Sequence, residues 1–173
     1  MPVEDMLGTA LGRTPADAVF ENAEIFSPFT CSWERASFAV RAGIVVGIGD
    51  YRGIEEHDLH GARVVPGLID SHVHIESSLL TPSEFGRLAL RHGTTTAIAD
   101  PHEIANVCGI PGIEFMLRES ARTPLDIFYM LPSCVPATPQ DSGGAMLSSR
   151  DLASLSGREG IIGVGEVMNV PGV

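Results

Sequence analysis

Cysteine is scarce in this sequence, and its three cysteines lie far apart. Cys31, Cys108 and Cys134 are an odd number, at spacings that suit neither a disulfide framework nor a Cys-x-x-Cys zinc knuckle. Reduced thiols in a protein of the cytoplasm are the simplest account of them.

Basic residues are also few. The 173 residues include 11 Lys and Arg against 22 Asp and Glu, which gives a formal net charge of −11. Such a chain offers no basic surface for a phosphate backbone, and its charge disfavours anionic membranes. We therefore expect neither nucleic acid nor a membrane among its partners.

Long apolar runs are missing as well. No run approaches the roughly 18 residues that a membrane-spanning helix needs. The opening Met1-Pro-Val-Glu-Asp-Met6 has acids where a signal peptide would have lysines. With 44% hydrophobic and 19% charged residues, the composition is that of a globular protein. We expect this protein in the cytoplasm.

Residues 1–64 form the first of two regions with different patterns. From about Asp17 to Val64, short β-rich runs alternate with turns, and there is almost no helix signal. The runs are Val19–Ile25, Ser37–Arg41, Ile44–Gly49 and Glu56–Leu59, with turns at Ala42-Gly43 and His60-Gly61. This pattern predicts a small sheet that forms part of a β-sandwich domain.

Residues 65–173 repeat the order strand, polar loop, helix. The predicted strands are Val64–His74, Thr94–Ala99, Leu125–Leu131 and Gly160–Val164, and the predicted helices begin at Thr81 and lie around Pro111–Ser120 and Ser149–Leu155. The segment Thr81–Glu84 has the form of a capping box with proline at the first helical position. Strands that alternate with helices imply parallel pairing through right-handed crossovers.

Each predicted strand ends in side chains that are able to do chemistry. They are His72 and His74, Asp100 and His102, Ser133 and Cys134, and Glu166. Polar groups at the carboxyl ends of successive strands are typical of the active site of a (β/α)8 barrel. A doubly wound open sheet is the alternative, but it usually opens with a glycine fingerprint, which is missing here. We predict an α/β fold that forms the first half of a TIM-type (β/α)8 barrel.

The most specific motif is His72-Val73-His74. Alternate side chains of a strand share a face, so the two histidines point the same way, with Asp70 on that face. Two neutral imidazoles at the catalytic end of a buried strand are costly unless a divalent metal binds their lone pairs. A pair of hydrogen-bonded histidines is the alternative.

An acid, Glu166, ends the fourth predicted strand after two glycines. One carboxylate can join two metal ions about 3.5–4 Å apart. An ordinary strand-end acid that caps a helix or pairs with an arginine is the alternative.

Asp100, His102 and Glu103 lie at the rim of the second strand, which Pro101 terminates. Asp100 could orient a metal-binding imidazole, and Glu103 could shuttle protons. His102 could contact substrate or an accessory metal. For each of them the alternative is a loop residue that caps a helix or is solvated.

Cys134 is a candidate nucleophile, but no His–Asp partner set is evident for it. A buried structural thiol that lines the pocket is the favoured interpretation.

Four segments resemble bacterial and archaeal adenine deaminases, a branch of the amidohydrolase superfamily. The segments are Val65–Ser78, Ile98–Asn106, Met130–Pro139 and Gly165–Asn169. The resemblance extends from about Ala16 to the last residue. The two histidines alone mark only the superfamily, whereas the other three segments, in this order and spacing, are more specific.

The resemblance implies a metallo-barrel flanked by a β-sandwich that is built from both chain termini. The implied reaction is hydrolytic deamination of adenine to hypoxanthine and ammonia by a metal-bound hydroxide. His72 and His74 would bind the more buried metal and Glu166 would bridge a pair of Mn²⁺ or Fe²⁺ ions, with Glu103 and Asp100 as catalytic residues. The expected partner is a small purine, and the full-length enzyme is expected to be a homo-oligomer.

A complete barrel needs about 250 residues, so we expect this chain to be an amino-terminal fragment that is inactive alone. Two other functions stay open. One is a different amidohydrolase, acting on cyclic amides, in which a lysine typically stands at the position of Glu166. The other is a non-catalytic half-barrel scaffold.

Overall fold

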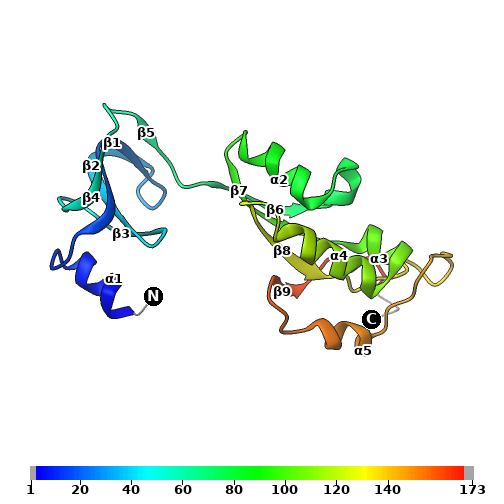
Figure 1. The fold of residues 1–173 in the computed structure, drawn as a ribbon. Helices are drawn as coiled ribbons and strands as arrows, with labels where there is room; N and C mark the ends of the chain where they lie inside the picture. Colours follow the sequence, from blue (N-terminus) through cyan, green and yellow to red (C-terminus); the bar gives the residue numbers. More distant parts are fainter. Residues whose placement is uncertain (1–2, 170–173) are drawn as a thin grey trace. The chain divides into compact units, whose positions relative to one another are not determined.

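The computed structural model describes residues 3–169, and the chain divides into two compact units, one up to Pro66 and one from Gly67. The units are described separately and are labelled in Figure 1. None of the helices within residues 3–169 is both long and apolar enough to cross a bilayer.

One sheet of five strands forms most of the first unit. The strands are β1 (Ala16–Ser27), β2 (Ser32–Arg41), β3 (Ile44–Ile48), β4 (Gly53–Asp58) and β5 (Arg63–Val64). Their order is β3-β2-β1-β4, and β5 pairs with the later part of β1. The β1–β2 and β2–β3 pairs are antiparallel, whereas β4 and β5 run parallel to β1. The predicted small sheet is present, and its place in a β-sandwich stays a prediction.

A short helix, α1 (Val3–Ala10), precedes this sheet. No pattern in the sequence predicts it, because a helix of eight residues is marginal by itself and depends on tertiary contacts. Its end is tied to the unit by Tyr51, whose hydroxyl donates to the carbonyl oxygen of Ala10 at 3.2 Å.

Four parallel strands form the sheet of the second unit, in the order β6-β7-β8-β9. They are β6 (Leu68–Val73), β7 (Thr94–Ala99), β8 (Asp126–Leu131) and β9 (Ile161–Val164). The connections contain the 3-10 helix η1 (Ile75–Ser78) and the helices α2 (Pro82–Leu90), α3 (His102–Cys108), α4 (Ile110–Ser120) and α5 (Ser149–Leu155). This alternation confirms the predicted α/β class.

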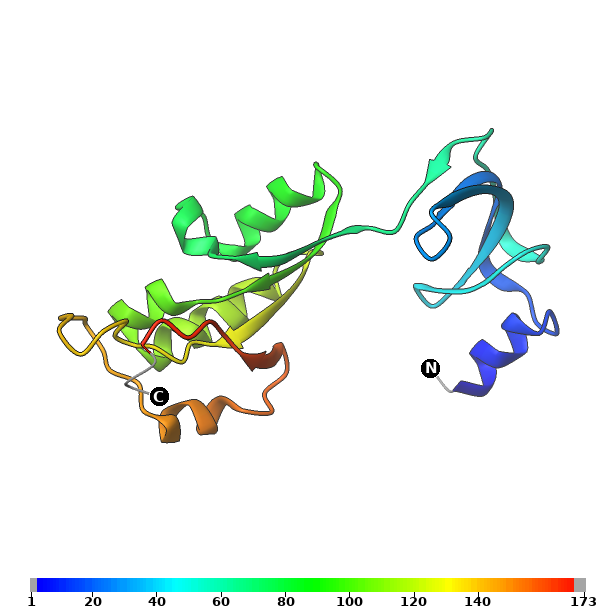
Figure 2. The ribbon, with the colours of Figure 1, turned by 180° about the vertical axis from the view of Figure 1, so that it is seen from behind.

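The main core of the second unit lies between the sheet and the helices α2 and α4. Its buried members are Ile75, Ala97, Ala99, Met116, Leu125, Ile127 and Tyr129, with Phe85 and Ala89 packed against them. The helix α4 lies in front of the strands in Figure 1 and behind them in Figure 2, which is seen from the opposite side.

The first strand of the second unit is shorter than predicted. Val64 belongs to β5 in the first unit, and β6 begins only at Leu68, after a proline that has no N–H for a sheet ladder. His74 lies just beyond β6, as the residue that precedes η1.

Two predictions about helices were wrong in detail. The segment after Asp100 is the helix α3, not a loop. At Thr81 no capping box forms, because the hydroxyl bonds to Ser83 Oγ at 3.1 Å and not to a backbone N–H.

Candidate metal centre

The carboxyl end of β6 brings His72 and His74 together. Their Nε2 atoms are 3.1 Å apart, and their ring centroids are 4.8 Å apart. The side chain of His72 is 53% exposed and that of His74 is 23% exposed. Two ring nitrogens are therefore presented at one accessible point on the rim of the sheet.

The ring of His74 is oriented by the backbone of Asp100. Its Nδ1 lies 3.1 Å from the carbonyl oxygen of Asp100. A carbonyl oxygen only accepts, so Nδ1 carries the hydrogen and Nε2 of the neutral ring keeps a lone pair. Metal-binding histidines typically have this arrangement, in which the second ring nitrogen donates to a carbonyl or carboxylate.

Glu166 approaches the same point from the segment that follows β9. Its Oε1 lies 3.7 Å from Nε2 of His74, and its Oε2 lies 3.8 Å from Nε2 of His72. The histidines lie at the end of β6 and the acid follows β9, and these are the two edge strands of the four-stranded sheet. The structure thus brings together the three residues that the sequence predicts to be metal ligands.

Asp100 lies beneath these residues and is completely buried. Its Oδ2 accepts the N–H of Glu166 at 3.0 Å, and its Oδ1 lies 3.3 Å from Nδ1 of His102. Gly165 allows this close approach, because a Cβ atom at that position would lie 2.0 Å from Oδ2 of Asp100. Both carboxylate oxygens of Asp100 are therefore engaged in holding other residues of the site.

The first turn of α3 adds His102 and Glu103. Nδ1 of His102 lies 3.4 Å from Oε1 of Glu166. Oε2 of Glu103 lies 3.4 Å from Nδ1 of His74, while its Oε1 accepts a hydrogen bond from Ser77 Oγ at 3.0 Å. Glu103 is thus next to the histidine pair, and His102, whose role the sequence leaves open, is part of the same cluster.

Sequence reasoning missed Glu76, which follows the histidine pair by two residues. Its Oε1 accepts the N–H of Ile104 at 3.2 Å and so satisfies a free donor at the start of α3. Burial raises the pKa of Glu76 above its ordinary value, and hydrogen bonds from N–H groups offset part of this effect. An acid close behind the histidine motif is the signal that could have identified it.

The negative groups of the site favour a cation. Burial lowers the pKa of His74, but the hydrogen bond to Asp100 and the charges of Glu103, Glu166 and Asp100 outweigh it, so the pKa is raised. Oε2 of Glu103 and Oε2 of Glu76 are buried and accept no hydrogen bond within the described part of the chain. Buried acceptors without donors fit a site that binds a positive ion.

The donor atoms also fit a metal ion. Three groups of ligand atoms lie within 4.8 Å of one another: His72, His74 and Glu166; His74, His102 and Glu103; and Asp100, His102 and Glu166. All are imidazole nitrogens or carboxylate oxygens, and none is a thiolate. Such a set suits a divalent metal ion.

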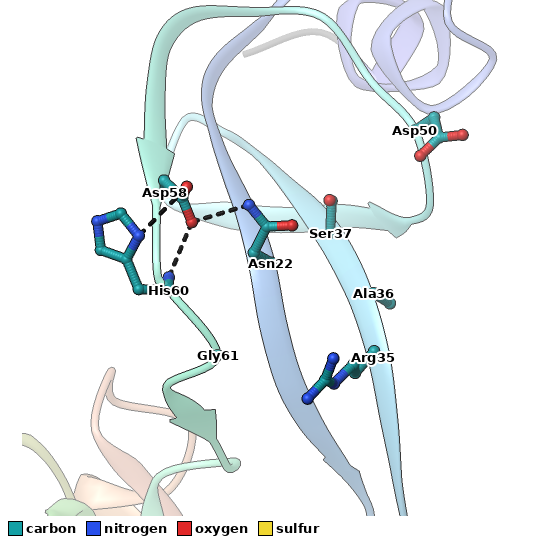
Figure 3. Close-up of a pocket in the computed structure, with 8 residues that line it drawn as sticks. All are labelled: Asn22, Arg35, Ala36, Ser37, Asp50, Asp58, His60 and Gly61. Carbon is teal, nitrogen blue, oxygen red and sulfur yellow. Dashed lines mark hydrogen bonds and ion pairs between the residues drawn. The ribbon is translucent and has the colours of Figure 1, made fainter.

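A second group of histidine and acid lies in the first unit, beside a hollow of about 520 Å³ (Figure 3). There Asp58 accepts hydrogen bonds from Asn22 Nδ2 and from the N–H of His60, each at 2.8 Å. Asn22 lies at the irregularity in the pairing of β1 with β2, and His60 lies in the turn after β4. Their φ angles are 55° and 51°, so Asp58 holds two separate residues of left-handed backbone. We call these three residues the Asp58 cluster.

The family of the chain follows from its sequence match. The model of the amidohydrolase family matches residues 63–166, which is more than half of the chain and includes every residue of the site. The chain belongs to the amidohydrolase family.

Similar proteins sharpen this assignment. The chain is 61% identical over 170 residues to the "Adenine deaminase" of Methanoregula boonei, covering 98% of this chain and 30% of that protein. It is 69% identical over 136 residues to the "Adenine deaminase" of Methanoculleus marisnigri, covering 79% and 26%. The "Adenine deaminase 2" of Carboxydothermus hydrogenoformans is 48% identical over 172 residues, covering 99% and 30%. The predicted resemblance is confirmed, and the chain spans less than a third of the length of these curated relatives.

Two solved structures share the fold. The D-hydantoinase (dihydropyrimidinase) from Thermus sp. matches with a TM-score of 0.57 and 18% identity, over 80% of this chain and 30% of that one. The β-aspartyl dipeptidase from Fervidobacterium islandicum AW-1 matches with a TM-score of 0.52 and 20% identity, over 90% and 42%. At such low identity these similarities concern the fold alone.

Proposed function

We propose that this chain contributes the metal-binding and proton-transfer residues of an enzyme that hydrolyses adenine to hypoxanthine and ammonia. The observation on which this depends is the convergence of His72, His74 and Glu166 at the carboxyl end of a parallel sheet. The high identity to proteins named adenine deaminase supports the choice of substrate.

His72, His74 and Glu166 would hold a divalent metal, for which Mn²⁺ or Fe²⁺ suits the donor set. When bound, such an ion lowers the pKa of a water molecule toward neutrality and so supplies hydroxide. His74 would present Nε2 to the ion, because its Nδ1 donates to Asp100. Glu166 would offer a carboxylate oxygen to the ion that the two imidazoles hold, because its oxygens lie 3.7 and 3.8 Å from their Nε2 atoms, and a bridge from Glu166 to a second ion is part of the proposal.

Glu103 is the proposed proton-transfer residue. Deamination requires that a proton reaches the amino group before it leaves as ammonia. The hydrogen bond from Ser77 holds Oε1 of Glu103, and Oε2 accepts no hydrogen bond within the described chain. Glu103 therefore has one oriented oxygen and one that is available to accept and return a proton.

Asp100 has a positioning role in this proposal. It is completely buried, and its three oxygen atoms contact His74, His102 and the N–H of Glu166. It would fix the tautomer of one ligand and the backbone of another without touching substrate.

We further propose that the four-stranded sheet is the first half of a (β/α)8 barrel and that the first unit is part of a β-sandwich. Adjacent strands lie about 4.8 Å apart, so the edge strands β6 and β9 would be about 14 Å apart in a flat sheet. The side chains of His74, just beyond β6, and Glu166, after β9, nevertheless approach to 3.7 Å, as expected if the sheet curls around the site. A cytoplasmic location and a homo-oligomeric full-length enzyme remain predictions.

A chimera tests the proposed function. The aligned 170 residues of this chain would replace their counterpart in the M. boonei protein. With Mn²⁺ present, we expect hypoxanthine and ammonia from adenine, measured by chromatography and an ammonia assay. Glu166→Ala should lower kcat/KM by more than about a hundredfold. Residues that only orient a metal ligand already change activity by about 10–100-fold, and the loss of a ligand itself should exceed that range.

The exposed acid Glu159 provides the control, because Glu159→Ala removes a carboxylate near β9 without touching the site. Its activity should equal that of the unsubstituted chimera. A folded, metal-loaded chimera that hydrolyses dihydrouracil, a cyclic amide, and leaves adenine unchanged would refute the proposal.

A further inference from the structure

We infer that Ser133 and Cys134 form a clamp that positions Glu166 for metal binding. Both residues lie just after β8, beyond Pro132, and β8 is the strand that pairs with β9. The inference rests on the proposed metal centre and assigns a role in it to two residues that do not themselves reach a metal ion.

Three hydrogen bonds join the clamp to the segment after β9. Ser133 Oγ donates to the carbonyl oxygen of Glu166 at 2.8 Å. Sγ of Cys134 accepts the N–H groups of Met168 and Asn169, each at 3.1 Å. The two clamp residues thus bind a length of backbone that begins at the proposed ligand and extends three residues beyond it.

The other side of Glu166 is held as well. Its N–H donates to the buried carboxylate of Asp100 at 3.0 Å. The last sheet contact before it is the bond from the N–H of Gly165 to the carbonyl oxygen of Leu131, at 2.7 Å. Glu166 lies past the end of the ladder, so side chains satisfy its backbone groups in place of a neighbouring strand. With both groups bound, only side-chain torsions remain to place its carboxylate.

Both donors of the clamp and both sulfur lone pairs have partners. The hydroxyl of Ser133 donates to Glu166, so its oxygen is free to accept the S–H of Cys134, whose Sγ lies 3.4 Å away. The sulfur lone pairs accept the two backbone N–H groups. Cys134 is only 3% exposed. This geometry suits a positioning residue and does not suit the nucleophile that the sequence left open.

A fixed backbone matters at this position because packing does not fix the side chain. The side chain of Glu166 is 39% exposed. A long exposed side chain loses rotamer entropy when it binds an ion, and a mobile backbone would add to that loss. Partners that orient a metal ligand typically change metal affinity by about 10–100-fold. The clamp should therefore be measurable as metal affinity.

The test is a titration of the 173-residue chain with Co²⁺, followed by its visible absorption. We expect Ser133→Ala and Cys134→Ala each to raise the Kd about tenfold, at the lower end of the range for such partners. Ser133→Thr keeps the hydroxyl donor and should restore most of the affinity. The matched controls are Ser142→Ala and Cys108→Ser, which alter exposed residues and should leave the Kd unchanged.

A double-mutant cycle separates positioning from general damage. If the clamp acts through Glu166, Ser133→Ala should weaken binding in the original chain and cause no further loss in the Glu166→Ala background. A loss of equal size in both backgrounds would overturn the clamp. If Ser133→Ala does not fold, judged by circular dichroism, the isosteric pair Ser133→Thr and Ser133→Val replaces it, and equal Kd values would overturn the clamp.

Failure of the clamp and failure of the metal centre give different results. An unchanged Kd in both clamp variants, with weaker binding in Glu166→Ala, would overturn the clamp alone. An unchanged Kd in Glu166→Ala would overturn the metal centre proposed above, and the clamp with it.

Discussion

Histidine and carboxylate side chains gather at two places in this chain, in the Asp58 cluster of the first unit and around His74 in the second. In the Asp58 cluster, Asn22 and His60 donate to the carboxylate, and Nδ1 of His60 lies 3.3 Å from its second oxygen. Around His74, the buried Oε2 atoms of Glu76 and Glu103 accept no hydrogen bond within the described chain.

The two groups differ in whether their carboxylate oxygens have hydrogen-bond donors. The Asp58 cluster is complete within its own unit, and its hydrogen bonds hold a turn. The site around His74 has more acceptors than donors and would gain from a cation, because a buried acceptor without a donor costs about 1–3 kcal/mol. Residue types alone therefore do not distinguish a metal site from a structural turn, whereas unsatisfied acceptors do.

The largest expected effect is on metal binding. His74→Ala removes the proposed ligand whose Nε2 faces both His72 and Glu166. The Kd for Mn²⁺ should therefore rise by more than about a hundredfold, which exceeds the range for residues that only orient a metal ligand. Electron paramagnetic resonance of free Mn²⁺ measures it. His60→Ala makes the same change in the Asp58 cluster and should leave the Kd unaltered. Equal effects of the two substitutions would remove the distinction between the two sites.

A smaller effect is expected on stability, from two glycines. Gly165→Ala places a Cβ atom 2.0 Å from Oδ2 of the buried Asp100, and overpacking of this kind costs about 1–3 kcal/mol. Gly61→Ala beside the Asp58 cluster has open space and only the cost of a φ of +80°, about 1 kcal/mol. Urea unfolding monitored by circular dichroism compares the two. A cost at Gly61 that exceeds the cost at Gly165 would contradict the packing described around Asp100.

The smallest effect concerns acid stability in the first unit. The N–H of His60 and the side chain of Asn22 lower the pKa of Asp58, and both effects outweigh burial. A lowered pKa in the folded state means that the stabilisation is present above the unfolded value of about 3.9 and disappears as the pH falls through the folded pKa. Asp58→Asn should therefore make the free energy of unfolding fall less steeply on acidification below pH of about 4. If the free energy of unfolding has the same dependence on pH in Asp58→Asn, the ionised form of Asp58 contributes nothing to stability.

Local patterns predicted several elements closely. The strand Thr94–Ala99 is confirmed as β7, and the helix Ser149–Leu155 is confirmed as α5. Both are encoded by neighbouring residues: β7 is a run of β-branched and apolar residues, and α5 begins at a capping box between Ser148 and Asp151.

The helix α3 could not be predicted in the same way. It has seven residues, and its first turn is capped by the side chain of Glu76, a residue 28 positions away from Ile104. A helix that depends on a donor–acceptor pair from another segment leaves no local signal. The consequence for the site is that His102 and Glu103 lie on a rigid element, where the sequence suggested a loop.

Most residues of the candidate site were predicted, with the exception of Glu76, whereas the contacts between them were predicted only in part. Strand alternation and the order of strand ends indicated His72, His74 and Glu166, because the carboxyl ends of parallel strands share one edge. The contact from Ser133 to Glu166 joins residues 33 positions apart, and no spacing rule predicts such a bond. Likewise, the carbonyl oxygen of Asp100 that orients His74 is a backbone atom, which residue identity cannot reveal.

X-ray absorption at the cobalt edge of the Co²⁺-loaded chain tests the central claim most directly, because it identifies the atoms bound to the metal. We predict scattering from two imidazole rings together with oxygen ligands, and the loss of one ring in His72→Ala and in His74→Ala. A spectrum with oxygen neighbours alone, unchanged by either substitution, would contradict the metal centre.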